Sequence, residues 1–286
     1  MTGWSLRIGP RTFSGPGPFV MGVVNATPDS FSDGGRWLDP DAAASRALAL
    51  ASEGADLVDV GGESTRPGAP PVAADEEIRR VVPVVERLVA GGLTVPISVD
   101  TSKPEVALAA LRAGAALVND VRGLSDPRLA EVVAAAGVPV VLMHTRGTPA
   151  DMRERSRYRD VAAEVRDELG EALRRAASAG VPAERTILDP GIGFAKTAAQ
   201  SLEVLARLGE LRSLGRPILV GPSRKSFIGA VTGAAVEDRL PGTLAAVAAA
   251  VLAGAEFVRV HDVGAARQAT LVAAAIRDAA PGRVSG

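Results

Sequence analysis

Eight short apolar segments recur along this chain, and each is followed by a longer, Ala-rich amphipathic segment. Short continuous apolar runs are typical of strands buried on both faces, as in a parallel sheet covered by helices. The segments predicted as strands are 19–25, 55–62, 96–100, 116–121, 139–144, 186–189, 217–221 and 256–261. The segments predicted as helices are 39–53, 74–91, 104–113, 127–136, 160–179, 199–214, 238–253 and 264–279. We interpret this recurrence as one βα unit repeated eight times.

Eight βα units are the number found in a (β/α)₈ TIM barrel, so the sequence predicts this α/β fold. Glycines that would end helices support the reading, because glycine is favoured at a helix C-cap. They are Gly54, Gly114, Gly137, Gly180 and Gly254, each just before a predicted strand. The main alternative is an open, doubly wound sheet, which normally has a glycine-rich phosphate loop after its first strand. Here NATPDSF follows the first predicted strand, without a G-x-G-x-x-G motif.

The length of 286 residues fits a single barrel domain over 1–286. Leu6 to Ile8 and Thr12-Phe13 flank a Gly9-Pro10 turn, which predicts a short β-hairpin. We therefore expect an N-terminal hairpin and lead-in over 1–18 and the barrel over 19–280.

Composition limits the classes of function. Hydrophobic residues make up 47% of the chain but aromatic residues only 3%, so we expect a core of Val, Leu, Ile and Ala. The net charge of −1 gives no reason to expect a nucleic acid or a membrane surface as partner. The chain has no cysteine, which excludes disulfides and thiolate metal sites. With no signal-peptide pattern and no apolar stretch of transmembrane length, we expect a cytoplasmic protein.

Polar side chains stand at the end of every predicted strand. Active sites of (β/α)₈ barrels lie at the C-terminal ends of the strands, so these side chains are the candidate site. In strand order they are Asn25; Glu63, Thr65 and Arg66; Asp100; Asn119 and Asp120; His144; Asp189; Ser223, Arg224 and Lys225; and Arg259 and His261. A single polar residue at a strand end is ordinary, because loops often begin with one. Polar residues at all eight strand ends together indicate a site.

The residue types indicate a ligand with a flat polar ring and an anionic group. Asp100, Asn119 and Asp189 suit a heterocycle with several N–H donors, since one carboxylate can accept two parallel N–H groups. Lys225 can donate to a ring carbonyl or nitrogen. The remaining candidates for holding a phosphate group are Arg259, His261 and Asn25, and the Asn25 oxygen also suits Mg²⁺ shared with a diphosphate.

Other motifs carry less information. The sequence around Ser223 lacks the second glycine of a nucleophile elbow, so a hydrolase nucleophile is disfavoured. Two histidines far apart in the chain, with no cysteine, argue against a tight zinc site. Asp59, within an apolar strand, is interpreted as a core or supporting carboxylate. The charge run 153–159 is interpreted as a solvated loop and helix start.

Several ordered motifs resemble those of one known family. "MGVVNATPDSFSDGG" (21–35) and "DVGGESTRPGA" (59–69) are the most specific, and they are followed by "DTSKPEVA", "NDVRG", "MHTRGTP", "DPGIGFAK", "SRKSFIG" and "RVHDV" in the family's order. Over most of its length the chain resembles the dihydropteroate synthases. The resemblance implies a (β/α)₈ barrel that condenses 6-hydroxymethyl-7,8-dihydropterin diphosphate with p-aminobenzoate, through an SN1-like loss of diphosphate assisted by Mg²⁺. It also implies sulfonamides as competitive inhibitors and a homodimer.

The resemblance also implies roles for individual residues. The pterin pocket would comprise Asp100, Asn119, Asp189 and Lys225, with Met143 against the ring. The diphosphate and Mg²⁺ would bind at Asn25, Arg259 and His261, with Thr65 nearby and Asn25 as the metal ligand. The p-aminobenzoate site would use Thr65, Arg66, Pro67, Phe194, Ser226 and Phe31. The residues expected to act in catalysis are Asn25, Asp33, Arg66, Lys225, Arg259 and His261, with Asp33 and Arg66 on two loops that close over the site.

The sequence departs from the common family pattern at a few positions outside these residues. Thr145 and Arg146 stand where many members have Met and Gln, Ala195 stands where Gly is common, and "VRGLSDP" replaces the commoner form after the fourth strand. Two alternatives remain open: a degenerate, non-catalytic paralogue, and a pterin-binding methyltransferase domain. Domains of the latter kind lack the TPDSFSDGG and STRPG loops that this chain has.

Overall fold

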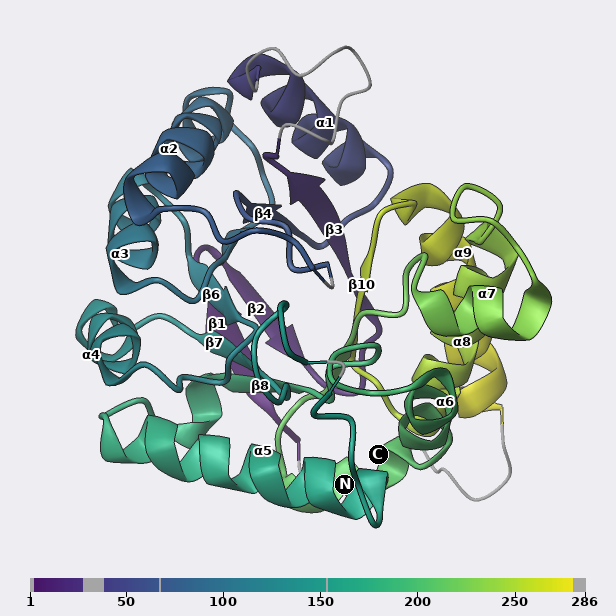
Figure 1. Cartoon of the computed structure of the whole chain (residues 1–286). Coiled ribbons are helices and arrows are strands. Elements are labelled where there is room, and N and C mark those ends of the chain that lie inside the picture. The colour runs from purple at the N-terminus through teal and green to yellow at the C-terminus, as the bar shows by residue number, and fades with distance from the viewer. Residues whose placement is uncertain (1–2, 28–38, 67, 153, 280–286) are drawn as a thin grey trace.

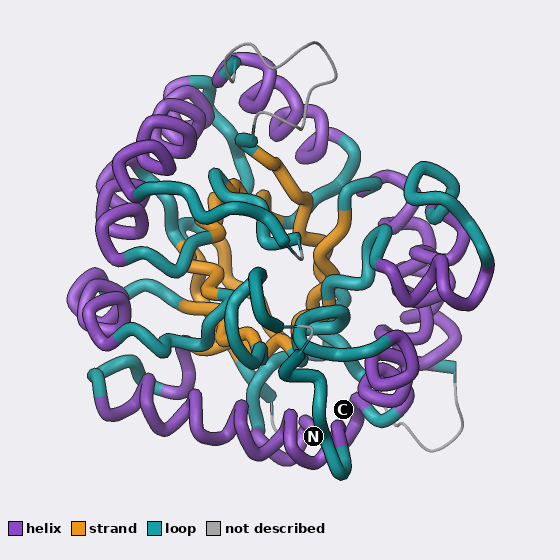
Figure 2. Tube along the Cα trace, viewed as in Figure 1, coloured by secondary structure: helices purple, strands orange, loops and turns teal. Residues whose placement is uncertain are grey.

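Eight parallel strands form a ring, and helices surround it (Figures 1 and 2). The structure is a computed structural model that describes residues 3–27, 39–66, 68–152 and 154–279. Neighbouring strands pair in the order β8-β7-β6-β5-β4-β3-β10-β9. A parallel bridge between Leu188 and Ile218 joins the two ends of this order and closes the barrel. The predicted (β/α)₈ fold is confirmed.

The strands and helices occur where the sequence predicted them, with three differences. The barrel strands are β3 (Phe19–Asn25), β4 (Leu57–Gly61), β5 (Ile97–Asp100), β6 (Leu117–Asp120), β7 (Val140–Met143), β8 (Thr186–Asp189), β9 (Leu219–Val220) and β10 (Phe257–Val260). The α-helices are α1 (Pro40–Ser52), α2 (Ala74–Ala90), α3 (Pro104–Ala113), α4 (Pro127–Ala136), α5 (Val161–Ser178), α6 (Ala198–Ala206), α7 (Ser226–Thr232), α8 (Leu240–Ala253) and α9 (Val263–Asp278). Short 3₁₀ helices are η2 (Ala183–Arg185) and η3 (Leu208–Leu214).

The differences have local causes. The predicted helix 199–214 divides into α6 and η3, in which Leu208 and Leu211 are both buried at the three-residue period of a 3₁₀ helix. Helix α7 was not predicted, because its seven residues are too few to show a helical period. Strand β9 is shorter than expected, with only two residues. Elsewhere Gly114, Gly137 and Gly254 are C-caps as predicted, whereas Gly54 and Gly180 each follow the C-cap residue by one position.

The N-terminal hairpin closes one end of the barrel. Strands β1 (Ser5–Ile8) and β2 (Arg11–Ser14) pair antiparallel, which confirms the predicted hairpin. Its apolar side chains pack against residues near the start of the barrel strands; the buried members of this cluster are Leu6, Ile8, Phe13, Met21, Leu57, Leu117, Val141, Ile187, Leu219 and Phe257. Four of the few aromatic residues gather here, and the Phe13 and Phe19 ring centroids are 4.9 Å apart. The opposite, C-terminal end of the strands is therefore where the polar side chains lie.

Alternation along the strands sends side chains either to the barrel axis or to the helix layer. On β4, Val58 and Val60 join the main core of aliphatic residues with the helices, as the composition predicted. Leu57 joins the hairpin cluster, and Asp59 on the same face reaches side chains of β6 and β10. Among the described residues, no helix is both long and apolar enough to cross a membrane.

Candidate active site

Arg259 on β10 is the centre of a polar cluster within the C-terminal part of the barrel. Its Nε donates to Asp59 Oδ2 at 2.6 Å, and its Nη2 donates to Asp100 Oδ2 at 2.7 Å. Burial opposes the guanidinium charge, but the two carboxylates outweigh it and raise the pKa of Arg259 above its ordinary value. Strands β4, β5 and β10 thus contribute one linked group of charges.

Asp59 also fixes the orientation of the Asn119 amide. Asn119 Nδ2 donates to Asp59 Oδ2 at 2.9 Å, and both residues are buried. An ionised carboxylate only accepts hydrogen bonds, so the amide nitrogen of Asn119 must face Asp59. The amide oxygen then points the other way, as an acceptor.

Two further carboxylates stand at the ends of β5 and β8. Burial raises the pKa of Asp100 to about 7; Arg259 opposes this shift and the charge of Asp59 adds to it. Burial also raises the pKa of Asp189, against the opposing charge of Lys225. Asp189 Oδ1 accepts a hydrogen bond from the Gly191 backbone N–H at 2.7 Å. Raised pKa values at a cleft are typical of functional carboxylates.

Lys225, the residue just before α7, extends its side chain to this cluster. Its ammonium donates to the Ile192 carbonyl oxygen and lies 4.6 Å from the centroid of the Phe194 ring. Burial lowers its pKa to about 8, although Asp189 opposes the shift. Lys225 is therefore mostly protonated at neutral pH and loses its proton as the pH rises through about 8.

The loop after β8 needs glycine at position 191. Gly191 has a φ of 65°, and a Cβ atom built there would lie 1.9 Å from the His144 carbonyl oxygen. No side chain fits in that space, so the loop can lie against the end of β7 only with glycine. This close approach places Ile192 and Phe194 beside Lys225.

His261 follows β10 and is paired with Ser223. Ser223 Oγ lies 2.9 Å from His261 Nδ1 and accepts from the His261 backbone N–H at 3.3 Å. Burial, with the positive charges of Arg259 and Arg224, lowers the pKa of His261 to about 4. A neutral ring whose Nδ1 accepts from the Ser223 hydroxyl carries its proton on Nε2. His261 can thus donate one hydrogen bond to a ligand oxygen.

The donor set for a metal ion is small. Asn25 ends β3, opposite Gly61 of β4, and is partly buried. Within the part of the chain that the structure describes, no three His, Asp or Glu side chains are grouped to hold a metal ion. One neutral oxygen fits Mg²⁺, which keeps waters and binds through few protein ligands together with substrate phosphates.

The loop after β4 carries Thr65, which is partly buried, and Arg66, which is exposed. The positive charge of Arg66 contributes to the lowered pKa of His261. At the base of the loop, Lys103 forms ion pairs with Glu63 and with Glu77. Three predicted site residues, Phe31, Asp33 and Pro67, lie outside the described residues.

Comparisons with known proteins identify the family of this chain. A family model described as "Pterin binding enzyme" matches residues 21–261. The dihydropteroate synthase of Escherichia coli K12 is 47% identical over 246 residues, which are 86% of this chain and 87% of the relative. The chain belongs to the dihydropteroate synthase family.

Solved structures of the family show the same fold. The Xanthomonas albilineans dihydropteroate synthase with 4-aminobenzoic acid has a TM-score of 0.91 and 48% identity, and the match covers 98% of this chain and 100% of that one. The Yersinia pestis dihydropteroate synthase in a sulfonamide complex also has a TM-score of 0.91, with 42% identity and coverage of 96% and 100%.

Contacts in the structure join Asp100 to Arg259 and Phe194 to Lys225, and two residues outside the implied set take part in the same region. Asp59 was interpreted as a supporting carboxylate, and it contacts both Arg259 and Asn119. The signal that places it in the site is alternation, since Asp59 lies on the axis-facing side of β4. Ser223, set aside as a nucleophile, holds the His261 ring instead.

His144 is a correction to the predicted set of strand-end side chains. It is buried, and its ring contacts Glu168 on α5 and Lys196 rather than the Arg259 cluster. Met143, the preceding residue, pairs in register with Asp189. Because neighbouring side chains on a strand point to opposite faces, Met143 takes the axis-facing position and His144 turns to the helix layer.

Proposed function

We propose that this chain condenses 6-hydroxymethyl-7,8-dihydropterin diphosphate with p-aminobenzoate, giving 7,8-dihydropteroate and diphosphate in folate biosynthesis. The observation that carries the proposal is the convergence of acceptors and one ammonium group around Arg259. The acceptors are Asp100, Asp189 and the Asn119 amide oxygen oriented by Asp59. A dihydropterin ring offers several N–H donors and one carbonyl on its edge, which such a set can bind.

The pterin-binding roles follow from the donor and acceptor types. Asp189 and Asn119 accept from ring N–H groups, and Lys225 donates to the ring carbonyl or to a ring nitrogen. Met143 supplies an apolar contact. Asp100 accepts a further N–H and can keep the bond that Arg259 donates to Oδ2, because a carboxylate has two acceptor oxygens.

The diphosphate would lie at Asn25, Arg259 and His261. Arg259 supplies a permanent positive charge, and the neutral His261 ring donates from Nε2. Mg²⁺ bound through Asn25 would neutralise negative charge on the diphosphate as it leaves. These residues orient the leaving group and stabilise the charge that it gains.

The reaction needs no strong general base. The bond between the exocyclic CH₂ and the diphosphate oxygen breaks, and the electron pair leaves with diphosphate. The amine nitrogen of p-aminobenzoate then forms the new C–N bond and loses one proton to water or to diphosphate. We assign the p-aminobenzoate site to Thr65, Arg66, Phe194 and Ser226 together with Phe31 and Pro67, and we assign the closing loops to Asp33 and Arg66.

The assembly and location follow from the same proposal. We propose a homodimer, because large apolar side chains are exposed on α8 and α9; they are Leu252, Leu271, Val272 and Ile276.

A charged pterin diphosphate does not cross membranes unaided, so we place the enzyme in the cytoplasm. We propose one domain over 1–286. Since a family member was solved in a sulfonamide complex, sulfonamides should compete with p-aminobenzoate here.

Binding measurements test the proposal. We expect the pterin diphosphate to raise the melting temperature of the protein, and a sulfonamide to displace p-aminobenzoate. Lys225→Ala and Asp189→Asn should abolish pterin binding, and wild-type-like turnover in either variant would reject the assigned pocket. Stabilisation by methyltetrahydrofolate but not by the pterin diphosphate would favour the methyltransferase alternative. Ligand binding without turnover would indicate a non-catalytic paralogue.

A further inference from the structure

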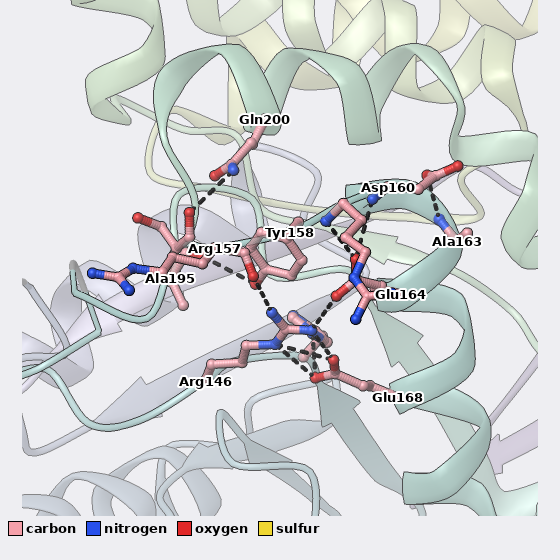
Figure 3. Close-up of polar contacts among 12 residues, drawn as sticks. Arg146, Arg157, Tyr158, Asp160, Ala163, Glu164, Glu168, Ala195 and Gln200 are labelled. Carbon is pink, nitrogen blue, oxygen red and sulfur yellow. Dashed lines mark hydrogen bonds and ion pairs between the residues drawn. The ribbon is translucent and has the colours of Figure 1, made fainter.

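A charged cluster that the proposed reaction does not use lies beside the pterin pocket, with Lys196 and His144 buried and Glu168 and Arg146 partly buried. It contains Lys196, His144, Glu168 and Arg146, with Tyr158 against Arg146. Figure 3 shows Arg146 between Glu168 and Tyr158, close to Ala195. Two cations and the carboxylates of α5 balance one another here. The cluster borders the loop 190–196, which follows Asp189.

Lys196 binds this loop from within. Its residue is 9% exposed, and burial lowers its pKa to about 7; in the protonated form its ammonium group has three N–H donors. Nζ lies 3.1 Å from the Gly191 carbonyl oxygen, 3.1 Å from the Phe194 carbonyl oxygen and 2.8 Å from His144 Nδ1. Each donor therefore has one acceptor, and two of the three acceptors are main-chain atoms of the loop.

His144 connects Lys196 to helix α5. Because Nδ1 accepts from the ammonium, the ring proton is on Nε2, which donates to Glu168 Oε2 at 3.0 Å. Burial and the nearby positive charge of Lys196 lower the pKa of His144 to about 4, which agrees with a neutral ring. A neutral histidine thus links a buried cation to a carboxylate.

Arg146 and Tyr158 complete the support. Arg146 Nε donates to Glu168 Oε1 at 3.0 Å, and its guanidinium lies 4.0 Å from the centroid of the Tyr158 ring. The Tyr158 hydroxyl donates to the Ala195 carbonyl oxygen at 3.0 Å. Ala195 has a φ of 47°, a left-handed conformation that is unfavourable for a residue with a side chain. Contacts on both sides of the loop hold it in this conformation.

The same peptide groups contact the pocket. The Gly191 N–H donates to Asp189, and its carbonyl accepts from Lys196. The Ile192 carbonyl accepts from Lys225, and the Phe194 ring lies beneath the Lys225 ammonium. Lys196 therefore contacts loop 190–196 on one side, and the pocket residues Asp189 and Lys225 contact it on the other.

We propose that Lys196, supported by His144 and Glu168, is a positioning residue that holds loop 190–195 so that Asp189 and Lys225 can receive the pterin ring. It acts through the main chain and does not touch the substrate. The part of this inference that concerns the pterin rests on the proposed function, whereas the part that concerns the loop does not.

Two measurements on Lys196→Met test the proposal. The first is hydrogen exchange of the ligand-free protein, in which we expect the amides of 191–195 to exchange at least about tenfold faster than in the wild type. The second compares two probes, the dihydropterin diphosphate and inorganic diphosphate with Mg²⁺. Affinity for the pterin should fall roughly 10- to 100-fold, while affinity for inorganic diphosphate, which would bind at the other side of the site, should not change.

Arg207→Met is the matched control. Arg207 lies just beyond α6, and its replacement removes ion pairs to Asp160, Glu203 and Glu210. None of these ion pairs involves a residue of the loop. We expect wild-type exchange in 191–195 and wild-type affinity for both probes. If Lys196→Met does not fold, Glu168→Gln tests the same connection from α5 and should give smaller changes in the same direction.

The outcomes separate the two proposals. Exchange of 191–195 at the wild-type rate in Lys196→Met, or in Glu168→Gln if that variant is used, would overturn the positioning role. An equal loss of affinity for both probes would overturn it as well, because it would indicate general damage. If the wild type itself binds no pterin diphosphate, the proposed function is wrong, and the exchange measurement still decides the role of Lys196 in the loop.

Discussion

Asp59 accepts a hydrogen bond from Arg259 at 2.6 Å, although the two residues are 200 positions apart in the chain. The same carboxylate oxygen accepts from Asn119 Nδ2 at 2.9 Å. One buried aspartate, on the strand between β3 and β5, therefore orients two side chains that we assign to substrate binding. Its contribution to the site is indirect, through the geometry of its neighbours.

Replacing Asp59 with asparagine should weaken both stability and binding. The change removes one buried negative charge beside Arg259, which keeps only Asp100 as an ionic partner, so we expect a loss of about 2 kcal/mol or more in the free energy of unfolding. Because an asparagine can rotate its amide, the orientation of Asn119 is no longer fixed, and kcat/KM should fall by at least about tenfold. Urea denaturation and steady-state kinetics measure the two effects.

Asp41→Asn serves as the control for this change. Asp41 pairs with Arg87, but its side chain is 72% exposed, and exposed ion pairs contribute little. We expect its stability and kinetics to stay near those of the wild type. Equal behaviour of Asp59→Asn and Asp41→Asn would contradict the role of Asp59.

Arg66→Ala should separate the two substrates. Arg66 is exposed on the loop after β4, and we assign it to the p-aminobenzoate site. Loss of its cation should raise the KM for p-aminobenzoate by roughly tenfold, because a charge-assisted contact to the carboxylate of that substrate is lost. Affinity for the pterin diphosphate should stay unchanged. If titration shows that pterin affinity falls instead, this loop has been assigned to the wrong substrate.

Pterin binding should depend on pH in a bell-shaped manner. Burial raises the pKa of Asp100 to about 7, so it becomes a charged carboxylate, able to accept at both oxygens, as the pH rises through this value. Burial lowers the pKa of Lys225 to about 8, so its ammonium is lost as a donor above this value. Affinity should therefore peak between about pH 7 and pH 8.

The ligand for that titration is 6-hydroxymethyl-7,8-dihydropterin, which lacks a diphosphate that would itself titrate. Asp100→Asn should abolish the loss of affinity at acid pH and leave the loss of affinity at alkaline pH unchanged. An affinity that is constant from pH 6 to pH 9 (roughly one unit beyond each of the two pKa values) would show that neither group binds the ring.

Acid should destabilise the protein through His144. In the unfolded chain this histidine binds a proton near its ordinary pKa of 6.5, whereas burial keeps the folded value at about 4. The unfolded state therefore binds more protons between these values, and the free energy of unfolding should fall by about 3 kcal/mol as the pH drops through that window. Glu168, whose pKa His144 and Arg146 lower to about 2 despite burial, adds a further loss below its ordinary value of 4.5.

Urea midpoints measured at several pH values between 7 and 4 check this expectation. His144→Phe removes the titrating ring but keeps an aromatic side chain, so its midpoint should change less over the same range. An unchanged difference between the two proteins at every pH would contradict a neutral, buried His144.

The barrel could be predicted from local sequence signals. The alternation of side chains along the strands accounts for the site residues that those signals misplaced. Buried apolar strands and glycines such as Gly137 and Gly254 at helix ends are set by nearby residues, so eight βα units were predictable. Helix α7 was not, because a helix of seven residues is stabilised mainly by its packing.

The residues that the structure links around Arg259 were predictable from strand ends, except where one residue of strand register matters. A shift of one position turns a side chain from the axis to the helix layer, which separates His144 from Met143. Asp59 lies deeper in its strand than the other site residues, and only the contacts across the barrel show that it reaches Asn119 and Arg259. Long-range contacts of this kind leave no local pattern in a sequence.

A turnover assay tests the central claim most directly. Purified protein would be mixed with 6-hydroxymethyl-7,8-dihydropterin diphosphate, p-aminobenzoate and Mg²⁺, and dihydropteroate and diphosphate would be measured. We expect equal amounts of the two products, and we expect their formation to stop when a chelator removes Mg²⁺ and to resume when the ion is restored. Absence of dihydropteroate in this assay of the folded, wild-type protein would contradict the proposed function.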